Sequence, residues 1–216
     1  MASDWEERTA REIERYDDGV ARLPDDNDER QRQLTRMGNA AWAAGLSFLM
    51  LGRNDEARAW LTRAAERYRE SWPQAPPGSW GRPIGAMKAR LIAGDRSGAE
   101  TDARWALEAG AAGSESTIGR YAAALAKLVL RVDVEAGEAA TPLRGRDDFP
   151  SPVADALVAV AARDAGAYEA AIRALLADFE AREQFLEDVP VADTVIVLQM
   201  LASERDLTVP LESRLL

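Results

Sequence analysis

The sequence predicts an all-α protein in which about nine to eleven helices stack as antiparallel pairs. Apolar residues recur at helical spacings, small residues recur where paired helices would touch, and Pro- and Gly-rich segments separate the helical stretches. The chain has 216 residues, of which 47% are hydrophobic, so it is long enough to bury a core. We expect one helical-repeat domain over residues 1–216, with a candidate internal boundary at 141–151.

The first two helices are expected on either side of Pro24. Helically spaced apolar residues extend to about Leu23, and Pro24 ends that helix. The acidic residues 25–29 can cap a second helix and place carboxylates in its first turn, and Gly52 stops it. These acids lack the glycine and the distal Glu of a calcium loop, so we expect no metal site there.

A helix pair at residues 41–64 surrounds the turn at Gly52. Its small and large residues follow the offsets of a tetratricopeptide unit: Ala44, Gly45, Phe48, Gly52, Ala57, Leu61 and Ala64. Similar offsets recur 42 residues downstream around Gly94, and again after Pro152. Three pairs, over roughly half of the chain, thus resemble tetratricopeptide repeats. The resemblance implies a right-handed solenoid or, where flanking helices cover its inner face, a closed helical bundle.

The match departs from the repeat pattern in several places. Ala41 stands where the leading Trp is expected, with Trp42 beside it, and the terminal Pro is missing. Arg90 replaces an aromatic residue in the second pair, and a Pro-rich insertion lengthens the usual period of about 34 residues.

Further on, we expect a long apolar helix between Ser114 and Ala136, a break at 141–150, a helix pair from Pro152, and a last helix over about 191–203.

The C-terminal third is similar to the bacterial immunity protein 49 family. The resemblance rests on apolar and alanine-rich segments at 154–157, 165–168, 200–202 and 209–211. It implies a helical protein that inhibits a toxin by binding it, without a catalytic signature. A toxin-immunity role is therefore one alternative for this chain.

Composition excludes several other functions. The chain has no Cys and no His, which removes thiolate metal sites, zinc helices and histidine-dependent triads. A net charge of −10 opposes binding to nucleic acid. No apolar run approaches the roughly 20 residues of a membrane span, and the acidic start is unlike a signal peptide, so we expect a cytoplasmic protein with no membrane partner. Abundant acids and only two Lys fit either a halophilic source or an Arg-favouring, GC-rich genome.

The expected function is non-enzymatic binding of a protein or peptide through an apolar inner groove, or self-association as a homodimer. An apolar inner face would be lined by the first helices of the first two pairs, while the run 79–83 would display an aromatic and a cation on a constrained backbone. The candidate residues are Trp42, Leu46, Leu49, Met50, Trp80, Arg82, Ile84 and Lys88. Two simpler interpretations remain: flanking helices cover this face, and Trp80 fixes its loop.

A small-molecule-binding protein or a His-independent enzyme is the remaining alternative, which a polar, carboxylate-lined cavity would indicate. Adjacent acids such as Glu187 and Asp188 point about 100° apart on a helix, so solvated charge explains them better than acid–base chemistry. Arg120 beside Tyr121 is a candidate buried polar site, or a surface Arg next to a core Tyr. We assign no catalytic residue, metal ligand or cofactor.

Overall fold

The computed structural model describes residues 2–216, and within them it contains ten α-helices, four short 3₁₀ turns and no strand. The prediction of an all-α chain with about nine to eleven helices is confirmed. The chain forms two compact units. Unit 1 runs to Arg96 and includes Phe185–Pro190, and unit 2 contains Ser97–Gln184 and Val191–Leu216. The candidate boundary at 141–151 lies inside unit 2.

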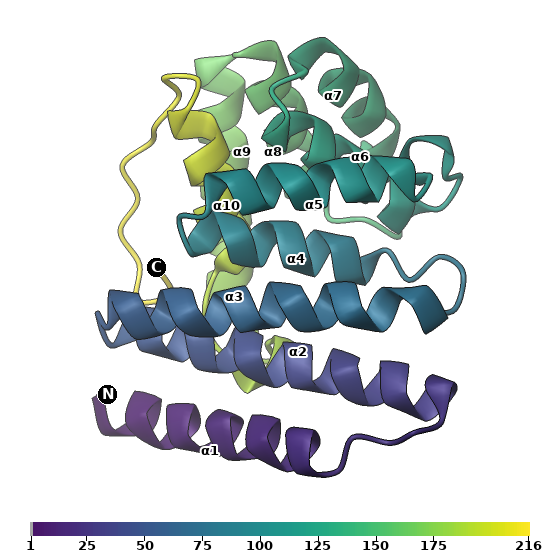
Figure 1. The fold of residues 1–216 in the computed structure, drawn as a ribbon. Coiled ribbons are helices and arrows are strands. Elements are labelled where there is room, and N and C mark those ends of the chain that lie inside the picture. The colour runs from purple at the N-terminus through teal and green to yellow at the C-terminus, as the bar shows by residue number, and fades with distance from the viewer. Residues whose placement is uncertain (1) are drawn as a thin grey trace. The chain divides into compact units, whose positions relative to one another are not determined.

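Unit 1 is a stack of four long helices in chain order. Figure 1 shows their axes running nearly parallel, with each helix reversing the direction of the one before it, and each packs on the next. Its elements are α1 (Ala2–Ala21), α2 (Asn27–Met50), α3 (Asn54–Ser71), η1 (Trp72–Gln74), α4 (Gly81–Ile92) and, from the distant segment, η4 (Leu186–Asp188).

Glycine allows the helices of unit 1 to approach each other closely around large side chains. The ring of Tyr68 on α3 lies between Gly38 of α2 and Gly85 of α4, and a Cβ atom at either glycine would come within 2.8 Å of the ring. A Cβ at Gly45 would lie 2.7 Å from Cγ of Leu61. The small and large positions predicted at Gly45 and Leu61 therefore do meet, because only a missing side chain leaves room for Leu61.

The acidic stretch after Pro24 caps α2 as predicted. The carboxylate of Asp26 accepts hydrogen bonds from the backbone N–H groups of Asp28 and Glu29, each at 3.0 Å. These N–H groups have no partner within the helix, so the cap satisfies them and adds negative charge at the positive end of the helix dipole. The sequence pattern of acids before an apolar helix is thus explained by helix initiation.

One turn geometry closes alternate helices of the chain, among them those that end before Gly52, Gly94, Arg131 and Arg163. Gly52 and Gly94 have φ of 71° and 72°, and Arg131 and Arg163 have φ of 59° and 55°. At each site the residue with positive φ donates its N–H to the carbonyl three residues earlier, and the next residue donates to the carbonyl five residues before itself. The turns recur at intervals of 42, 37 and 32 residues. Only the first two carry the glycine that this conformation favours.

Unit 2 contains the remaining helices and two 3₁₀ turns. The elements are α5 (Arg96–Glu108, whose first residue is assigned to unit 1), η2 (Ala111–Gly113), α6 (Thr117–Val129), α7 (Asp133–Ala140), η3 (Thr141–Leu143), α8 (Ser151–Ala162), α9 (Ala165–Glu180) and α10 (Asp193–Ser203). From α6 onward they pack in chain order: α6 contacts α7, α7 contacts α8, α8 contacts α9, and the last helix lies against α8 and α9.

The prediction of one long helix between Ser114 and Ala136 is wrong. Ser116 caps the start, accepting from the N–H of Gly119 at 3.1 Å, but the helix ends at Val129 and α7 begins at Asp133. The chain turns at Arg131, which adopts the left-handed conformation without the glycine or proline that marks a helix end in a sequence. Tertiary packing of α6 on α7 overrides the local preference at this position.

Candidate functional site

The eight predicted partner-binding residues all belong to unit 1, and most of them are inside it. Trp42, Leu46, Trp80, Arg82, Ile84 and Lys88 are buried. Leu49 and Met50, at the end of α2, are half-buried. An incoming protein or peptide would therefore reach Leu49 and Met50 first, and partner binding by this set remains a prediction.

Contacts made by this set join α2, α4 and the Pro-rich segment 72–80 that precedes α4. The ammonium of Lys88 lies 5.6 Å from the ring centroid of Trp42, a cation–π contact between α4 and α2. Trp80 packs on Trp72 with ring centroids 5.6 Å apart and a 43° angle between planes. These contacts give Trp42 and Trp80 a role in the packing of unit 1.

Arg82 is a buried cation held by neutral groups. Its Nε donates to Oγ1 of Thr35 at 3.1 Å, and its Nη2 donates to Oε1 of Gln31. Nη1 is buried and has no hydrogen-bond partner, and none of the described carboxylates pairs with this guanidinium. Burial lowers the pKa of Arg82, because desolvation disfavours the charged form.

The adjacent acids Glu187 and Asp188 do not form a free acid–base pair. Both have positive φ, of 53° and 55°, in the η4 turn. Oε2 of Glu187 accepts from Arg15 at 2.8 Å and Oε1 accepts from Asn39 at 2.8 Å. Both oxygens of the Glu187 carboxylate are thus occupied by contacts that tie the η4 turn to α1 and α2.

A cavity of about 320 Å³ opens in unit 2 beside α6. Arg120, Ala123 and Lys127 line it from one face of α6, since positions three and seven residues apart on a helix share a side. The loop before α6 and the end of α7 form the other walls. The full lining is Ala111, Ala112, Gly113, Ser114, Glu115, Arg120, Ala123, Lys127, Glu138, Ala139 and Pro142. Small residues predominate, so the walls leave the space unfilled.

The charged residues of this cavity are mostly unpaired. The side chains of Arg120, Glu115 and Glu138 have no ion pair or hydrogen bond among the described residues, and Nε of Arg120 is buried without a partner. Only Lys127 is engaged, with its Nζ 3.7 Å from Oε2 of Glu135. Two cations and two carboxylates therefore face one partly open space and leave hydrogen-bonding capacity for a ligand.

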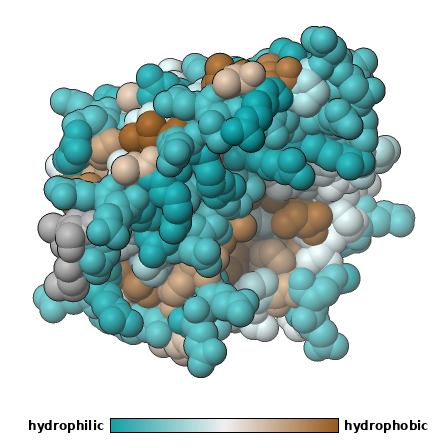
Figure 2. Space-filling view, turned by 90° about the horizontal axis from the view of Figure 1, so that it is seen from below, coloured by the Kyte–Doolittle hydropathy of each residue, from teal (hydrophilic) through white to brown (hydrophobic). Residues whose placement is uncertain are grey.

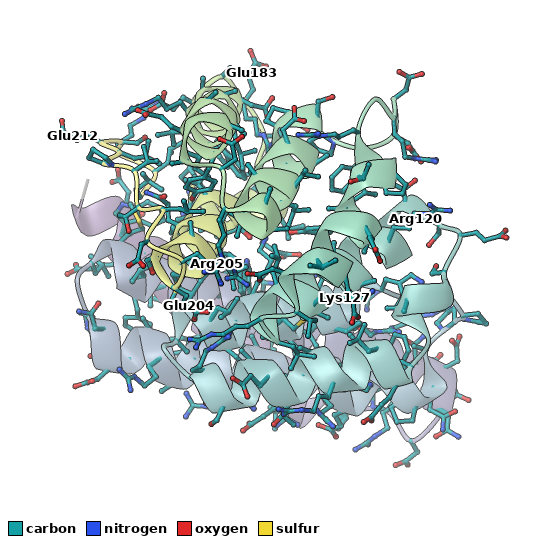
Figure 3. All side chains as sticks on the ribbon, turned by 90° about the horizontal axis from the view of Figure 1, so that it is seen from above. Arg120, Lys127, Glu183, Glu204, Arg205 and Glu212 are labelled. Carbon is teal, nitrogen blue, oxygen red and sulfur yellow. The ribbon has the colours of Figure 1, made fainter. Side chains whose placement is uncertain are left out.

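The second charged cluster of unit 2 is internally satisfied. Arg205 is buried, and its guanidinium donates to Oδ1 of Asp133 at 3.0 and 2.5 Å and to the carbonyls of Leu128 at 2.9 Å and Leu201 at 2.7 Å. For Asp133, burial acts to raise the pKa, but hydrogen bonds and charge from Arg205 and Arg163 outweigh it and lower the pKa. Figure 3 shows Glu204 and Arg205 well apart from Arg120 and Lys127. This cluster ties α10 to α6 and α7.

The sequence left two interpretations of Arg120, a buried polar site with Tyr121 or a surface Arg next to a core Tyr, and Tyr121 is a core residue as in the second. Tyr121 is buried, and its ring packs on Phe149 with centroids 5.4 Å apart. Arg120 lies instead in the cavity with Lys127, Glu115 and Glu138. The available signal was the Arg120–Ala123–Lys127 spacing, which places two cations and a small residue on one helical face.

The described residues contain no group of three or more acidic side chains arranged to hold a metal ion. Over the same part of the chain, no helix combines the length and apolarity needed to cross a membrane.

Comparison of the chain with family models, with curated proteins and with solved structures found no match. The resemblances to tetratricopeptide repeats and to immunity protein 49 thus rest on residues and helix pairing alone.

Proposed function

We propose that this protein is a non-enzymatic binding protein of tetratricopeptide-like, solenoidal construction whose partner is a protein or peptide. The observation that supports it best is the recurrence of one turn at Gly52, Gly94, Arg131 and Arg163. A repeated helix–turn–helix unit is the way such solenoids grow, and their extended surfaces serve mainly for binding.

The contacts of α4 support the same proposal. In a growing solenoid each new helix packs on both helices of the preceding pair. Here α4 packs along α3, bonds to α2 through Arg82 and Thr35, and meets α2 again through Lys88 and Trp42. Contacts of α4 with both α2 and α3 are those expected of neighbouring repeats, which favours the proposal.

Non-enzymatic function is supported by the absence of the commonest general base and by the pairing of two acids. The sequence has no His and no Cys. Glu187, an acid considered for acid–base chemistry, is bound by Arg15 and Asn39, and Asp18 pairs with Arg22 at 2.9 Å. These contacts give both carboxylates a structural role in unit 1.

A partner has accessible contacts at the end of α2. Leu49 and Met50 are half-buried there, whereas Trp42 and Leu46 are core residues. The face on the side of α1 is mainly hydrophilic, with apolar side chains gathered in smaller areas (Figure 2). A few apolar anchors within a polar surround are typical of protein-binding surfaces.

The proposal is tested by photo-crosslinking from a reactive amino acid at position 50 in a native extract, with position 173 on α9 as the control. We expect one protein to crosslink from position 50 only, and Met50→Glu to weaken binding of that purified protein about tenfold. Crosslinking to a second copy would identify a homodimer, and stoichiometric inhibition of a toxic enzyme would identify an immunity protein. Equal labelling from both positions, or none, would contradict the proposal.

A further inference from the structure

The cavity beside α6 presents both signs of charge on separate walls. Arg120 and Lys127 come from α6, Glu115 from the loop before it, and Glu138 from α7. Some neighbouring charges of unit 2 pair directly, as in Arg144 with Asp155 at 2.7 Å and Arg173 with Glu169 at 2.8 Å. In the cavity Arg120, Glu115 and Glu138 stay unpaired, although they line the same space.

From this arrangement we infer that the cavity binds a small amino-carboxylate, such as a free α-amino acid. Its carboxylate would be held by Arg120 and Lys127, because a guanidinium donates several hydrogen bonds in a plane that matches a carboxylate. Its ammonium group would lie toward Glu115 and Glu138, whose carboxylates accept from N–H donors. This ligand site is independent of the protein partner proposed above.

A ligand with only one charge fits less well. A simple carboxylate would bring its negative charge close to Glu115 and Glu138, and a simple amine would bring its positive charge close to Arg120 and Lys127. Like charges at short range repel, so the site discriminates by repulsion as well as by attraction. A ligand that carries both charges satisfies both walls.

The size and lining of the cavity limit the rest of the ligand. A volume of about 320 Å³ lies at the lower end of the range for small-molecule sites. Ala123, Ala139 and Pro142 supply apolar surface between the charged residues. A short aliphatic side chain fits this surface, whereas a folded peptide segment does not fit the volume.

The test is an NMR titration of the ¹⁵N-labelled full chain, read at the Nε–H signal of Arg120. The twenty common amino acids are added singly, with propionate and propylamine as analogues that lack one charge each. We expect at least one amino acid to bind about tenfold more tightly than either analogue, because each analogue lacks one of the two charged contacts.

Three variants and two controls separate binding from folding. Arg120→Gln and Glu138→Gln should each raise the Kd about tenfold, and Ala123→Leu should abolish binding by filling the cavity without changing its charges. Arg173→Gln and Glu183→Gln, whose side chains lie outside the cavity lining, should leave the Kd unchanged. Circular dichroism of each variant checks that the helices are retained.

The inference is overturned by any of three results. Propionate that binds as tightly as the amino acids would make this an anion site. Binding that survives both Arg120→Gln and Ala123→Leu would place the ligand elsewhere. The third result is an Arg120 signal that does not shift with any amino acid at ~10 mM. This concentration is about ten times the upper end of common Michaelis constants, so the result would show that the cavity holds only water.

Discussion

Unit 1 and unit 2 use the same turn between helices but fill their interiors differently. Unit 1 sets large side chains against glycines, as at Tyr68, and buries Arg82 among neutral groups. Unit 2 is rich in alanine, leaves a charged cavity beside α6, and buries Arg205 with a carboxylate and two carbonyls. The two units therefore allow a direct comparison of a buried cation that has only neutral partners with one that also has a carboxylate.

The largest expected effect is at the buried arginine of unit 2. Arg205→Met should lower the free energy of unfolding by about 3 kcal/mol, because it leaves the half-buried Asp133 without its strongest partner and removes one hydrogen bond from each of two carbonyls. Urea denaturation followed by circular dichroism measures the change. A decrease in the free energy of unfolding of less than about 1 kcal/mol would mean that Arg205 stabilises unit 2 no more than Arg82 is expected to stabilise unit 1.

Next in size is the glycine contact around Tyr68. Gly38→Ala should destabilise by about 1–3 kcal/mol, because the ring cannot move away from α2 without meeting Gly85 on α4. Gly113→Ala in unit 2, where an added Cβ meets nothing within 4 Å, serves as the control and should change stability by less than ~0.5 kcal/mol.

A double-mutant cycle sharpens the Gly38 prediction. In a Tyr68→Ala background the added methyl group has room, so Gly38→Ala should then be neutral or mildly stabilising, as expected from helix propensity. An unchanged cost of Gly38→Ala in that background would mean that Tyr68 is not the cause.

The shared turn gives a smaller effect that should differ between the units. Gly52→Ala should cost about 1 kcal/mol from backbone conformation alone, since no atom lies within 4 Å of the added Cβ. Arg131→Gly should change stability by less than that, because the relieved backbone is offset by loss of the contact with Glu204 at 3.3 Å. Thermal unfolding of both variants compares them directly.

The buried arginine of unit 1 should behave opposite to that of unit 2. Arg82→Met is expected to change the free energy of unfolding by less than ~1 kcal/mol or to raise it, because desolvation of Arg82 is not balanced by a carboxylate. Thr35 still donates to the carbonyl of Gln31, and Gln31 still donates to Asp28, after the change. A decrease in the free energy of unfolding as large as that expected for Arg205→Met would show that neutral partners are sufficient for a buried arginine to stabilise the fold.

The smallest effect is electrostatic and concerns Asp148 in unit 2. Hydrogen bonds from Arg146 and then Thr117 lower the pKa of this carboxyl to about 2. Since the folded pKa lies below the unfolded value of about 3.9, the stabilisation is present above that value and is lost as pH falls through 2. Arg146→Gln should raise the pKa toward 3.9, as measured by NMR titration. An unchanged pKa would show that Arg146 does not hold Asp148.

Helix number, the acidic cap of α2 and the glycine turns could be predicted, because they depend on local chemistry. An Asp before a helix can cap its first turn, and a Gly after a helix can end it, whatever the rest of the fold, as Asp26 and Gly52 do here. The turn at Arg131 could not be predicted, since an Arg adopts positive φ only when packing on both sides requires it. The cavity beside Arg120 was missed for a related reason: Glu115 and Glu138 line the same space as Arg120 only through the fold.

The sequence by itself determined an all-α chain of paired helices, without histidine or cysteine chemistry and with an acidic surface. These properties follow from composition and from a period of 3.6 residues, and neither needs distant contacts. Only the tertiary structure decided that Trp42 and Lys88 lie in a core, that Glu187 is bound to Arg15, and that unpaired charges meet beside α6. Burial and charge pairing depend on which residues meet across the fold, and local sequence carries little information about those contacts.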